Sequence, residues 1–220
     1  MSEIWFTSDT HFGHKNILEY EKEARPFKTL EEMHETLINN WNNTVGKKDT
    51  VYHLGDFAFG RDNIGIAAEL NGRKKLVMGN HDTYSSLLYL AHFERLFGCF
   101  YWRRCILTHI PVNPDNLGSR FFLNVHGHLH SKQVTTLKMN QDQYDAMWRS
   151  PDEHMGSFIF PRPDPNYFNV SVEQNGLKPV NSSVIMDRLK ELDDGLLPGD
   201  GQAERRREGY KKRMEGKCVL

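Results

Sequence analysis

The sequence predicts a single α/β domain, and three features support this prediction. The chain has 220 residues, of which 38% are hydrophobic, so it is long enough and apolar enough to form one packed domain. Short runs of β-prone residues recur along the chain and end at glycine or aspartate. Segments with apolar residues at helical spacing lie between these runs. Strands that alternate with helices in this way are typical of an α/β sheet.

The first half of the chain contains three expected strands, over residues 4–8, 50–54 and 75–78. Helices are expected from Thr29 onward, over 63–70 and over 85–96. Thr29 and Glu32 have the spacing of a capping box, which marks the start of the first of these helices. Its apolar residues recur at helical spacing and are expected in the core: Leu30, Met33, Leu37, Ile38 and Trp41.

The second half is expected to contain strands over 105–108, 121–125 and 168–173, and a short helix over 183–192. Residues 131–167 interrupt this rhythm, because they are polar and contain four prolines, so we predict a surface insertion there. Residues 193–220 begin like a linker and continue as a charged tail with seven Lys/Arg and three Glu over 203–217. The predicted domain is therefore 1–192, followed by a tail at 193–220.

Charge and composition exclude several classes of protein. Lys and Arg together number 28 and Asp and Glu 29, so the chain is neither a broadly basic nucleic-acid coat nor an acidic disordered chain. No apolar run approaches the roughly 18 residues of a membrane helix, and the N-terminus lacks the pattern of a signal peptide. The three cysteines do not suggest a disulfide framework. We therefore expect a cytoplasmic protein.

Histidine, with 11 residues, is the informative count, because it is the commonest metal ligand. Five clusters of Asp, Asn and His stand at or just after expected strand ends, where ligands gather in open α/β sheets. The clusters are Asp9-Thr10-His11, Gly55-Asp56, Gly79-Asn80-His81-Asp82, Thr108-His109 and Gly127-His128-Leu129-His130. Residues two apart on an extended backbone point the same way, so Asp9 and His11 can reach one point, as can His128 and His130. The glycines permit tight turns.

These side chains offer oxygen and nitrogen ligands without a thiolate. Such a mixture suits Mn²⁺, Fe or Zn²⁺ and argues against a cysteine-type structural zinc site. Two Asp, one Asn and four His of these clusters give seven candidate ligands. Seven ligands are too many for one catalytic ion and suit two ions, which can clamp the attacking and leaving oxygens in phosphoryl transfer. Asp56 stands alone in its cluster and is the natural bridge between two cations.

With these motifs in order, the sequence resembles the calcineurin-like metallophosphoesterase superfamily. The family pattern D-x-H, G-D, G-N-H-[DE], H, G-H-x-H is complete here, and the resemblance covers about residues 4–175. The local sequences from Ser8 to His14 and from Val51 to Asp56 are similar to those of small single-domain bacterial and phage-encoded members. The resemblance implies a β-sandwich of two sheets flanked by helices, and hydrolysis of phosphate esters.

The resemblance also implies a role for each matching residue. Asp9, His11 and His130 would hold a first metal ion, and Asn80, His109 and His128 a second. Asp56 would bridge the ions, and a hydroxide between them would attack phosphorus. His81 would stabilise the phosphoryl oxygen or protonate the leaving group, with Asp82 orienting it. We expect two divalent ions, with Mn²⁺ first and Fe or Zn²⁺ as alternatives.

The leading hypothesis is a phosphodiesterase that acts on a nucleotide or another small phosphate ester. His14 lies one turn after His11 and either contacts the substrate phosphate or is a surface residue. Arg25, Arg61 and Arg120 are either phosphate contacts or solvated surface residues, and the second interpretation is preferred. Aromatic residues of the insertion either stack on a base or pack on the domain. The alternatives for the whole chain are a nuclease on DNA or RNA, which the basic tail favours weakly, and a non-catalytic metal-binding scaffold.

Overall fold

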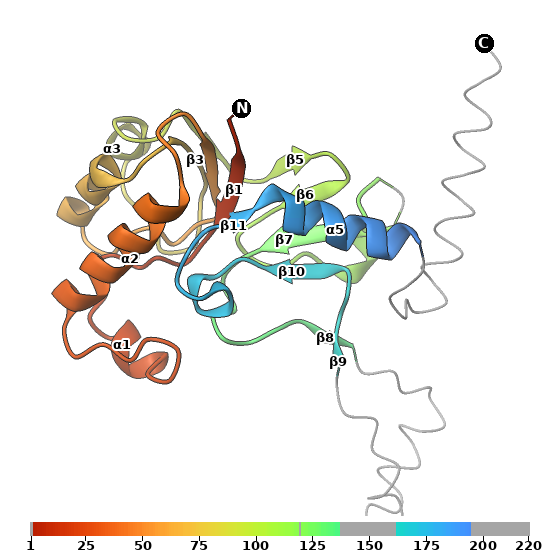
Figure 1. Cartoon of the computed structure of the whole chain (residues 1–220), viewed down its shortest axis with the longest axis horizontal. Coiled ribbons are helices and arrows are strands. Elements are labelled where there is room, and N and C mark those ends of the chain that lie inside the picture. Colours follow the sequence, from red (N-terminus) through yellow and green to blue (C-terminus); the bar gives the residue numbers. More distant parts are fainter. Residues whose placement is uncertain (1, 119, 137–161, 195–220) are drawn as a thin grey trace, which may run out of the picture. The chain divides into compact units, whose positions relative to one another are not determined.

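A computed structural model of the chain describes residues 2–118, 120–136 and 162–194 (Figure 1). It divides into two compact units, one of Met1–Lys132 with Pro165–Leu220 and one of Gln133–Asp164. The first unit contains the expected two sheets with flanking helices. In the second unit, the described residues form a short antiparallel pair of β8 (Thr135–Thr136) and β9 (Arg162–Pro163).

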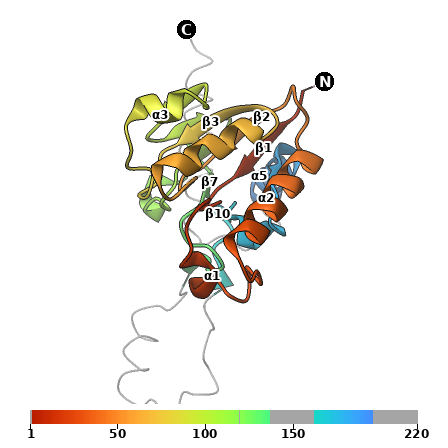
Figure 2. The same ribbon diagram turned by 90° about the vertical axis from the view of Figure 1, so that its left-hand side faces the viewer.

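The larger sheet has the strand order β11-β1-β2-β3-β4. Its four parallel strands are β1 (Ile4–Thr7), β2 (Thr50–His53), β3 (Arg73–Val77) and β4 (Arg95–Phe97). β11 (Val180–Asn181) pairs with β1 in the antiparallel direction. The connections are α1 (Ile17–Tyr20), α2 (Leu30–Thr44), the 3₁₀ segment η1 (Arg61–Glu69) and α3 (Ser86–Leu90). Figure 2 looks onto the side of the larger sheet on which these helices lie.

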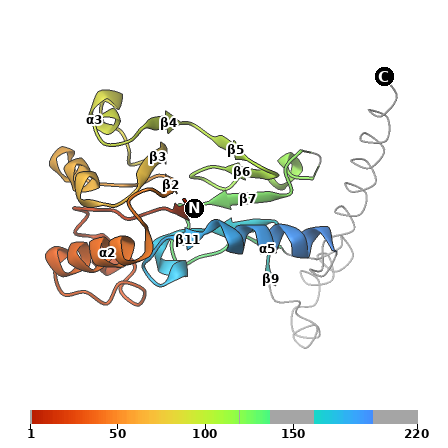
Figure 3. The ribbon, with the colours of Figure 1, turned by 45° about the horizontal axis from the view of Figure 1, so that its top comes forward.

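The smaller sheet has the order β10-β7-β6-β5. β6 (Cys105–Leu107), β7 (Leu123–His126) and β10 (Tyr167–Asn169) run parallel, and β5 (Phe100–Trp102) pairs antiparallel with β6. The 3₁₀ turns η2 (Pro114–Asn116) and η4 (Val172–Asn175) follow β6 and β10. α5 (Ser182–Asp193) continues directly from β11 and runs along the sheets (Figure 3).

Two hydrophobic cores lie on opposite faces of the larger sheet, because successive strand residues point to opposite faces. One core packs Val51 and Leu76 against Met33, Leu37 and Trp41 of α2. The other core lies between the two sheets, where Phe6 and Val77 of the larger sheet contact the smaller sheet and α5. The smaller sheet contributes Cys105, Leu107, Leu123 and Val125, and α5 contributes Ile185 and Leu189. The larger sheet is therefore packed against apolar side chains on both of its faces.

Most of the expected elements are present. Thr29 caps α2, since its hydroxyl accepts a hydrogen bond from the N–H of Glu32 at 3.2 Å. The helix predicted over 85–96 is wrong in its second half, since α3 ends at Leu90. Arg95–Phe97 instead forms strand β4, because its backbone pairs with that of β3. The strand predicted over 168–173 ends at Asn169, and η4 follows. Cys105 is buried and Cys99 is exposed, and both are free thiols.

The predicted insertion at 131–167 overlaps the second unit, while Tyr167 at its end is a buried residue of β10. Four of its five aromatic residues lie outside the described residues, as does the charged tail beyond Asp194. Each helix in the described part of the chain is too short or too polar to cross a membrane.

Candidate metal centre

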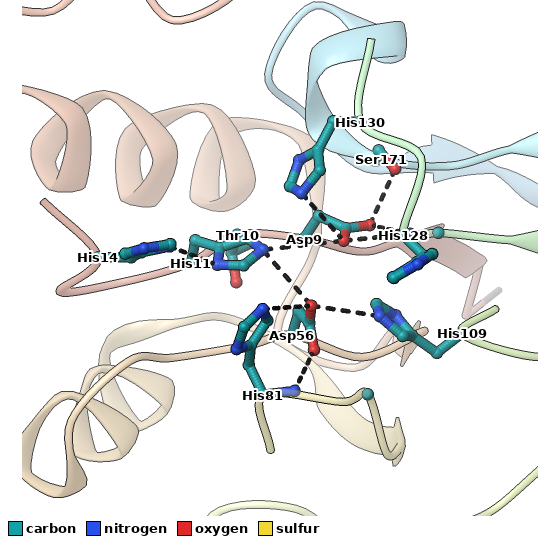
Figure 4. Close-up of polar contacts among 12 residues, drawn as sticks. Asp9, Thr10, His11, His14, Asp56, His81, His109, His128, His130 and Ser171 are labelled. Carbon is teal, nitrogen blue, oxygen red and sulfur yellow. Dashed lines mark hydrogen bonds and ion pairs between the residues drawn. The ribbon is translucent and has the colours of Figure 1, made fainter. Parts of the chain in front are cut away.

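All five predicted clusters meet at the carboxyl ends of β1, β2, β3, β6 and β7 (Figure 4). The two sheets join at this place, because Ser8 after β1 forms a parallel bridge with Ser171 after β10. The N–H of Ser8 donates to the carbonyl of Val170 at 3.1 Å, and the N–H of Val172 donates to the carbonyl of Ser8 at 3.2 Å. Loops from both sheets are thereby held around one site.

The backbone of the site is strained at five predicted ligands. Asp9, His11, Asp56, His128 and His130 all have φ between 50° and 69°, a left-handed region that L-residues rarely adopt. Among the described residues, only Arg103 and Leu177 share this conformation without being glycine. Strained conformations cost about 1–3 kcal/mol each and concentrate where a functional geometry requires them.

Glycines allow the loops to approach one another closely. A Cβ on Gly79 would lie 2.2 Å from Oδ1 of Asp56, and one on Gly127 would lie 2.4 Å from Oδ2 of Asp9. Gly55 has φ of +97°, and a Cβ there would lie 2.6 Å from Nδ1 of His109. Any other residue at these positions would displace a predicted ligand, which explains why glycine precedes Asp56, Asn80 and His128.

Asp9, His11 and His130 form the first group of candidate ligands, with one donor atom from each within 4.8 Å of the others. The Asp9 carboxylate is fixed by the Ser171 hydroxyl, which donates to Oδ2 at 2.8 Å, and by the N–H of His128. Nε2 of His11 is buried without a hydrogen-bond partner. A buried polar atom of this kind normally has a partner, so its position suits a bound cation.

Asp56, His109 and His128 form the second group, again within 4.8 Å. Nδ1 of His109 lies 2.8 Å from the carbonyl of Leu54, while its Nε2 faces Oδ1 of Asn80 at 2.9 Å and Oδ2 of Asp56 at 3.2 Å. When Nδ1 carries the proton, Nε2 presents a lone pair to the same point as two oxygen atoms. Three converging electron donors fit a divalent cation.

Asp56 belongs to the second group and also faces the first. Its Oδ2 is 3.2 Å from Nε2 of His109 in the second group and 3.6 Å from Nε2 of His11 in the first (Figure 4). Its Oδ1 accepts a hydrogen bond from the N–H of His81 at 2.8 Å, so the carboxylate cannot rotate freely. A carboxylate oxygen with imidazole nitrogens on both sides is placed to bridge two cations.

His81 reaches the site from the open side. Its Nε2 lies 4.0 Å from Oδ2 of Asp56, and its side chain is 40% exposed, whereas the candidate ligands around it are mostly buried. The Asp82 carboxylate accepts backbone N–H groups of Gly79, Asp56 and Phe57. These contacts act on the backbone of the site, so Asp82 holds the Asp56 and Gly79 loops together. The predicted orientation of the His81 ring by Asp82 stays a prediction.

His14 also lies at the site. Its Nδ1 is 3.1 Å from Nδ1 of His11, and its ring stacks on Phe59 with centroids 4.3 Å apart. His53 and His126 are buried, and burial lowers the pKa of His53 to about 3 and that of His126 to about 4. Nε2 of His34, a residue of α2, accepts a hydrogen bond from the N–H of Gly13 at 2.8 Å and so fixes the loop that carries His14.

Three residues of the site were not predicted as part of it. Ser171 and Glu173 follow β10 two residues apart, with the same spacing as Asp9 and His11, but the strand predicted through Glu173 concealed this. Arg25 was interpreted as a surface residue, and this is wrong, because its side chain is 0% exposed. The guanidinium of Arg25 contacts Glu173 and the carbonyls of Asp9 and Thr10. The carboxylate of Glu173 also lies 2.8 Å from Nδ1 of His130.

Burial and the charged neighbours shift the pKa values of the site in opposite directions. Burial raises the pKa of Asp9 and lowers that of His11 well below its usual value. Burial also opposes charge on His109 and His130, but hydrogen bonds to Asp56 and Glu173 outweigh it and raise both pKa values. The same partnership with His109 overcomes burial and lowers the pKa of Asp56. The site therefore favours a carboxylate at Asp56, the form that binds cations.

The comparisons with known proteins agree with this geometry. A family model described as calcineurin-like phosphoesterase matches residues 2–189. The chain belongs to this family. The matched region contains every predicted ligand together with His81 and Asp82, and it ends before the predicted tail at 193–220. As a calcineurin-like phosphoesterase, the protein is a metal-dependent hydrolase of phosphate esters.

Relatives of this phosphoesterase come from archaea, phages and bacteria. It is 33% identical over 199 residues to the uncharacterized protein MJ1445 of Methanocaldococcus jannaschii, covering 86% of this chain and 93% of that one. It is 40% identical over 107 residues to the Gene 66 protein of Mycobacterium phage L5, covering 46% of this chain and 49% of that one. A solved Aquifex aeolicus structure, titled a protein of unknown function, AQ665, has 26% identity and a TM-score of 0.58, with coverage of 85% and 99%.

Proposed function

We propose that this phosphoesterase hydrolyses small phosphodiesters, such as nucleotide esters, with two divalent ions, Mn²⁺ first. The observation that carries the proposal is the position of Asp56, whose Oδ2 lies between His11 of one candidate group and His109 of the other. Asp9, His11 and His130 would hold one ion, and Asn80, His109 and His128 the other. Ions in these positions supply an activated water and positive charge at the phosphoryl group.

The remaining roles belong to residues of the chain itself. His81 is the partly exposed histidine beside Asp56, and it would stabilise the phosphoryl oxygens or protonate the leaving oxygen. The ring centroid of His14 lies 5.1 Å from that of His11, and His14 would contact the substrate phosphate. Asp82 keeps the Asp56 and Gly79 loops together through three backbone hydrogen bonds, and so holds His81 near Asp56.

We infer that the substrate is a diester and not a monoester, because Arg25 is already bound within the protein. A monoester dianion carries a second negative charge, which enzymes often neutralise with a bidentate arginine. Arg25 is fully buried and its guanidinium is engaged by Glu173 and by the Thr10 carbonyl, so it is not available to a substrate. The free thiols of Cys99 and Cys105 support a reducing compartment, and we place the activity in the cytoplasm.

The test is hydrolysis of bis(p-nitrophenyl) phosphate by the purified chain with Mn²⁺, before and after treatment with a chelator. We expect turnover that the chelator abolishes and that added Mn²⁺ restores. Asp56→Asn removes the shared negative charge and is expected to lower kcat/KM at least about 100-fold, the typical scale for loss of one catalytic group. His81→Gln is expected to lower kcat by a similar factor while Mn²⁺ binding persists.

His92→Gln is the matched control, because it removes a histidine that belongs to none of the five clusters and is expected to keep wild-type turnover. Full activity in folded Asp56→Asn, or turnover that chelation does not change, would contradict the proposal. Faster turnover of p-nitrophenyl phosphate than of the diester would contradict the preference for diesters.

A further inference from the structure

An aromatic surface lies beside His81 at the open side of the site. We call it the aromatic rim and define it as Tyr20, His14 and Phe59. The ring of His14 lies parallel to that of Phe59 at 4.3 Å and edge-on to that of Tyr20 at 6.2 Å. Tyr20 is 70% exposed and Phe59 is 40% exposed. Large apolar side chains left in water as a group mark surfaces that bind something.

Phe59 is held rigidly in this exposed position. Its N–H donates to the carbonyl of Phe12 at 2.7 Å, and its carbonyl accepts the Asn63 side-chain amide at 2.7 Å. The preceding Ala58 forms a β-bridge with Phe12, and Phe57 is fully buried in the core. Since the ring is presented by a fixed backbone, a ligand that contacts it would lose little free energy in ordering it.

The rim is continuous with the candidate metal centre. The ring centroid of Phe59 lies 5.3 Å from that of His81, and the ring centroid of His14 lies 5.1 Å from that of His11. A phosphate ester bound at the metal centre therefore has the rim next to it. Whatever the phosphate carries on this side meets the edges and faces of aromatic rings.

We propose that the aromatic rim is a subsite for a flat aromatic ring carried by the phosphate ester, either a nucleobase or an aryl group. This inference rests on the proposed function, because it names the substrate class of the same site. Ring pairs at 4.5–7 Å are favourable in proteins, and stacking of a base on an aromatic side chain changes affinity by about 10-fold or more.

The experiment measures competitive inhibition of bis(p-nitrophenyl) phosphate turnover by three monoesters: phenyl phosphate, thymidine 5′-phosphate and methyl phosphate. In the wild type, we expect the two ring-bearing esters to bind at least about 10-fold more tightly than methyl phosphate. Phe59→Leu and Tyr20→Leu keep an apolar side chain but remove the ring. They are expected to raise the inhibition constants of the ring-bearing esters several-fold and to change that of methyl phosphate less than about 2-fold.

Tyr101→Leu is the matched control, because Tyr101 of β5 is also an exposed aromatic residue but stacks on Phe121 away from the predicted ligands. It is expected to change none of the constants. A wild type without turnover of any ester would overturn the proposed function. Turnover with equal inhibition by all three esters, or unchanged constants in Phe59→Leu and Tyr20→Leu, would overturn the rim alone. An effect confined to phenyl phosphate or to thymidine 5′-phosphate would identify which ring the rim accepts.

A second inference rests on different contacts, those of the buried pair Arg25 and Glu173. Both side chains are 0% exposed, and Nε and Nη2 of Arg25 lie 2.8 Å and 2.6 Å from Oε1 of Glu173. The same guanidinium binds the carbonyls of Asp9 and Thr10, in the strained turn that presents Asp9 and His11. The pair therefore connects that turn with the segment after β10.

Glu173 extends this connection to His130. Its Oε1 faces Nδ1 of His130 at 2.8 Å, so Nδ1 carries the proton and Nε2 is free to present its lone pair toward Asp9. We infer that Arg25 and Glu173 are positioning residues for the first group of ligands, because one ion pair sets the turn of Asp9 and His11 and also the tautomer of His130. Loss of such partners typically weakens metal binding about 10–100-fold.

The test is Mn²⁺ titration of Glu173→Gln, followed by calorimetry and by electron paramagnetic resonance of the bound ions. We expect one ion to bind about 10–100-fold more weakly and the other to bind as in the wild type. Glu191→Gln, which removes a surface carboxylate on α5, is the control. Two ions with wild-type affinity in folded Glu173→Gln would overturn the inference. In the wild-type protein at alkaline pH, ¹⁵N shifts that place the His130 proton on Nε2 would also overturn it, whether or not the variant folds.

Discussion

At the scale of single residues, the site depends on positions where the backbone and the ligand side chains meet closely. Five predicted ligands have left-handed φ values, and their strain is balanced by hydrogen bonds such as those of Asp82 to three backbone N–H groups. Gly55, Gly79 and Gly127 provide the space that these turns need. The predicted ligands thus have a backbone conformation that an isolated turn of the same sequence would not favour.

Gly79→Ala tests this dependence, because its Cβ would lie 2.2 Å from Oδ1 and 2.4 Å from the backbone nitrogen of Asp56. We expect a loss of about 1–3 kcal/mol in the free energy of unfolding and a loss of at least about 10-fold in turnover, since the Asp56 carboxylate must move. Urea unfolding and kinetics on bis(p-nitrophenyl) phosphate measure both. Gly65→Ala, which meets nothing within 4 Å, should stay within about 0.5 kcal/mol of wild type. Equal behaviour of the two variants would contradict this account.

At the scale of secondary structure, short parallel strands decide where the site forms. β1, β2, β3, β6 and β7 are 3–5 residues long, and a predicted ligand cluster begins one or two residues after the end of each. α2 begins where the Thr29 cap predicts, because capping is a local interaction. β4 was missed because its pairing with β3 is a long-range contact that overrides the local helical pattern of residues 85–96.

At the scale of the whole molecule, packing brings together residues as distant in sequence as Asp9 and Ser171. The two cores on opposite faces of the larger sheet hold its strand ends beside those of the smaller sheet. The chain carries a net charge of −1, yet carboxylates and imidazoles converge in one buried place. Such a place is more stable when a cation is bound to it than when it is not.

Added Mn²⁺ is therefore expected to raise the melting temperature. At a concentration about 100 times the dissociation constant, binding contributes about 2.7 kcal/mol, or roughly 5–10 °C for a domain of this size. Differential scanning fluorimetry with Mn²⁺, and with a chelator, measures the shift. Asp56→Asn should reduce the shift, because it removes the negative charge between the two groups. A wild type whose melting temperature is indifferent to both additions would contradict the existence of the metal centre.

The sequence by itself determined the α/β class and the family, because five short motifs in fixed order carry their chemistry in their residue types. It also predicted that His11, His109, His128 and His130 lie close together, and in the structure each of them belongs to one of the two groups of candidate ligands. These predictions depend on local spacing and on strand ends, which a linear pattern records.

The tertiary structure decided what depends on contacts between distant segments. Arg25 looks like a surface residue in the sequence, and only the fold shows it buried against Glu173, 148 residues away. The same holds for the aromatic rim, where Tyr20 at the end of α1 and Phe59 in the segment after β2 meet through His14. Burial and ion pairing arise from long-range packing, so they leave no periodic trace in the sequence.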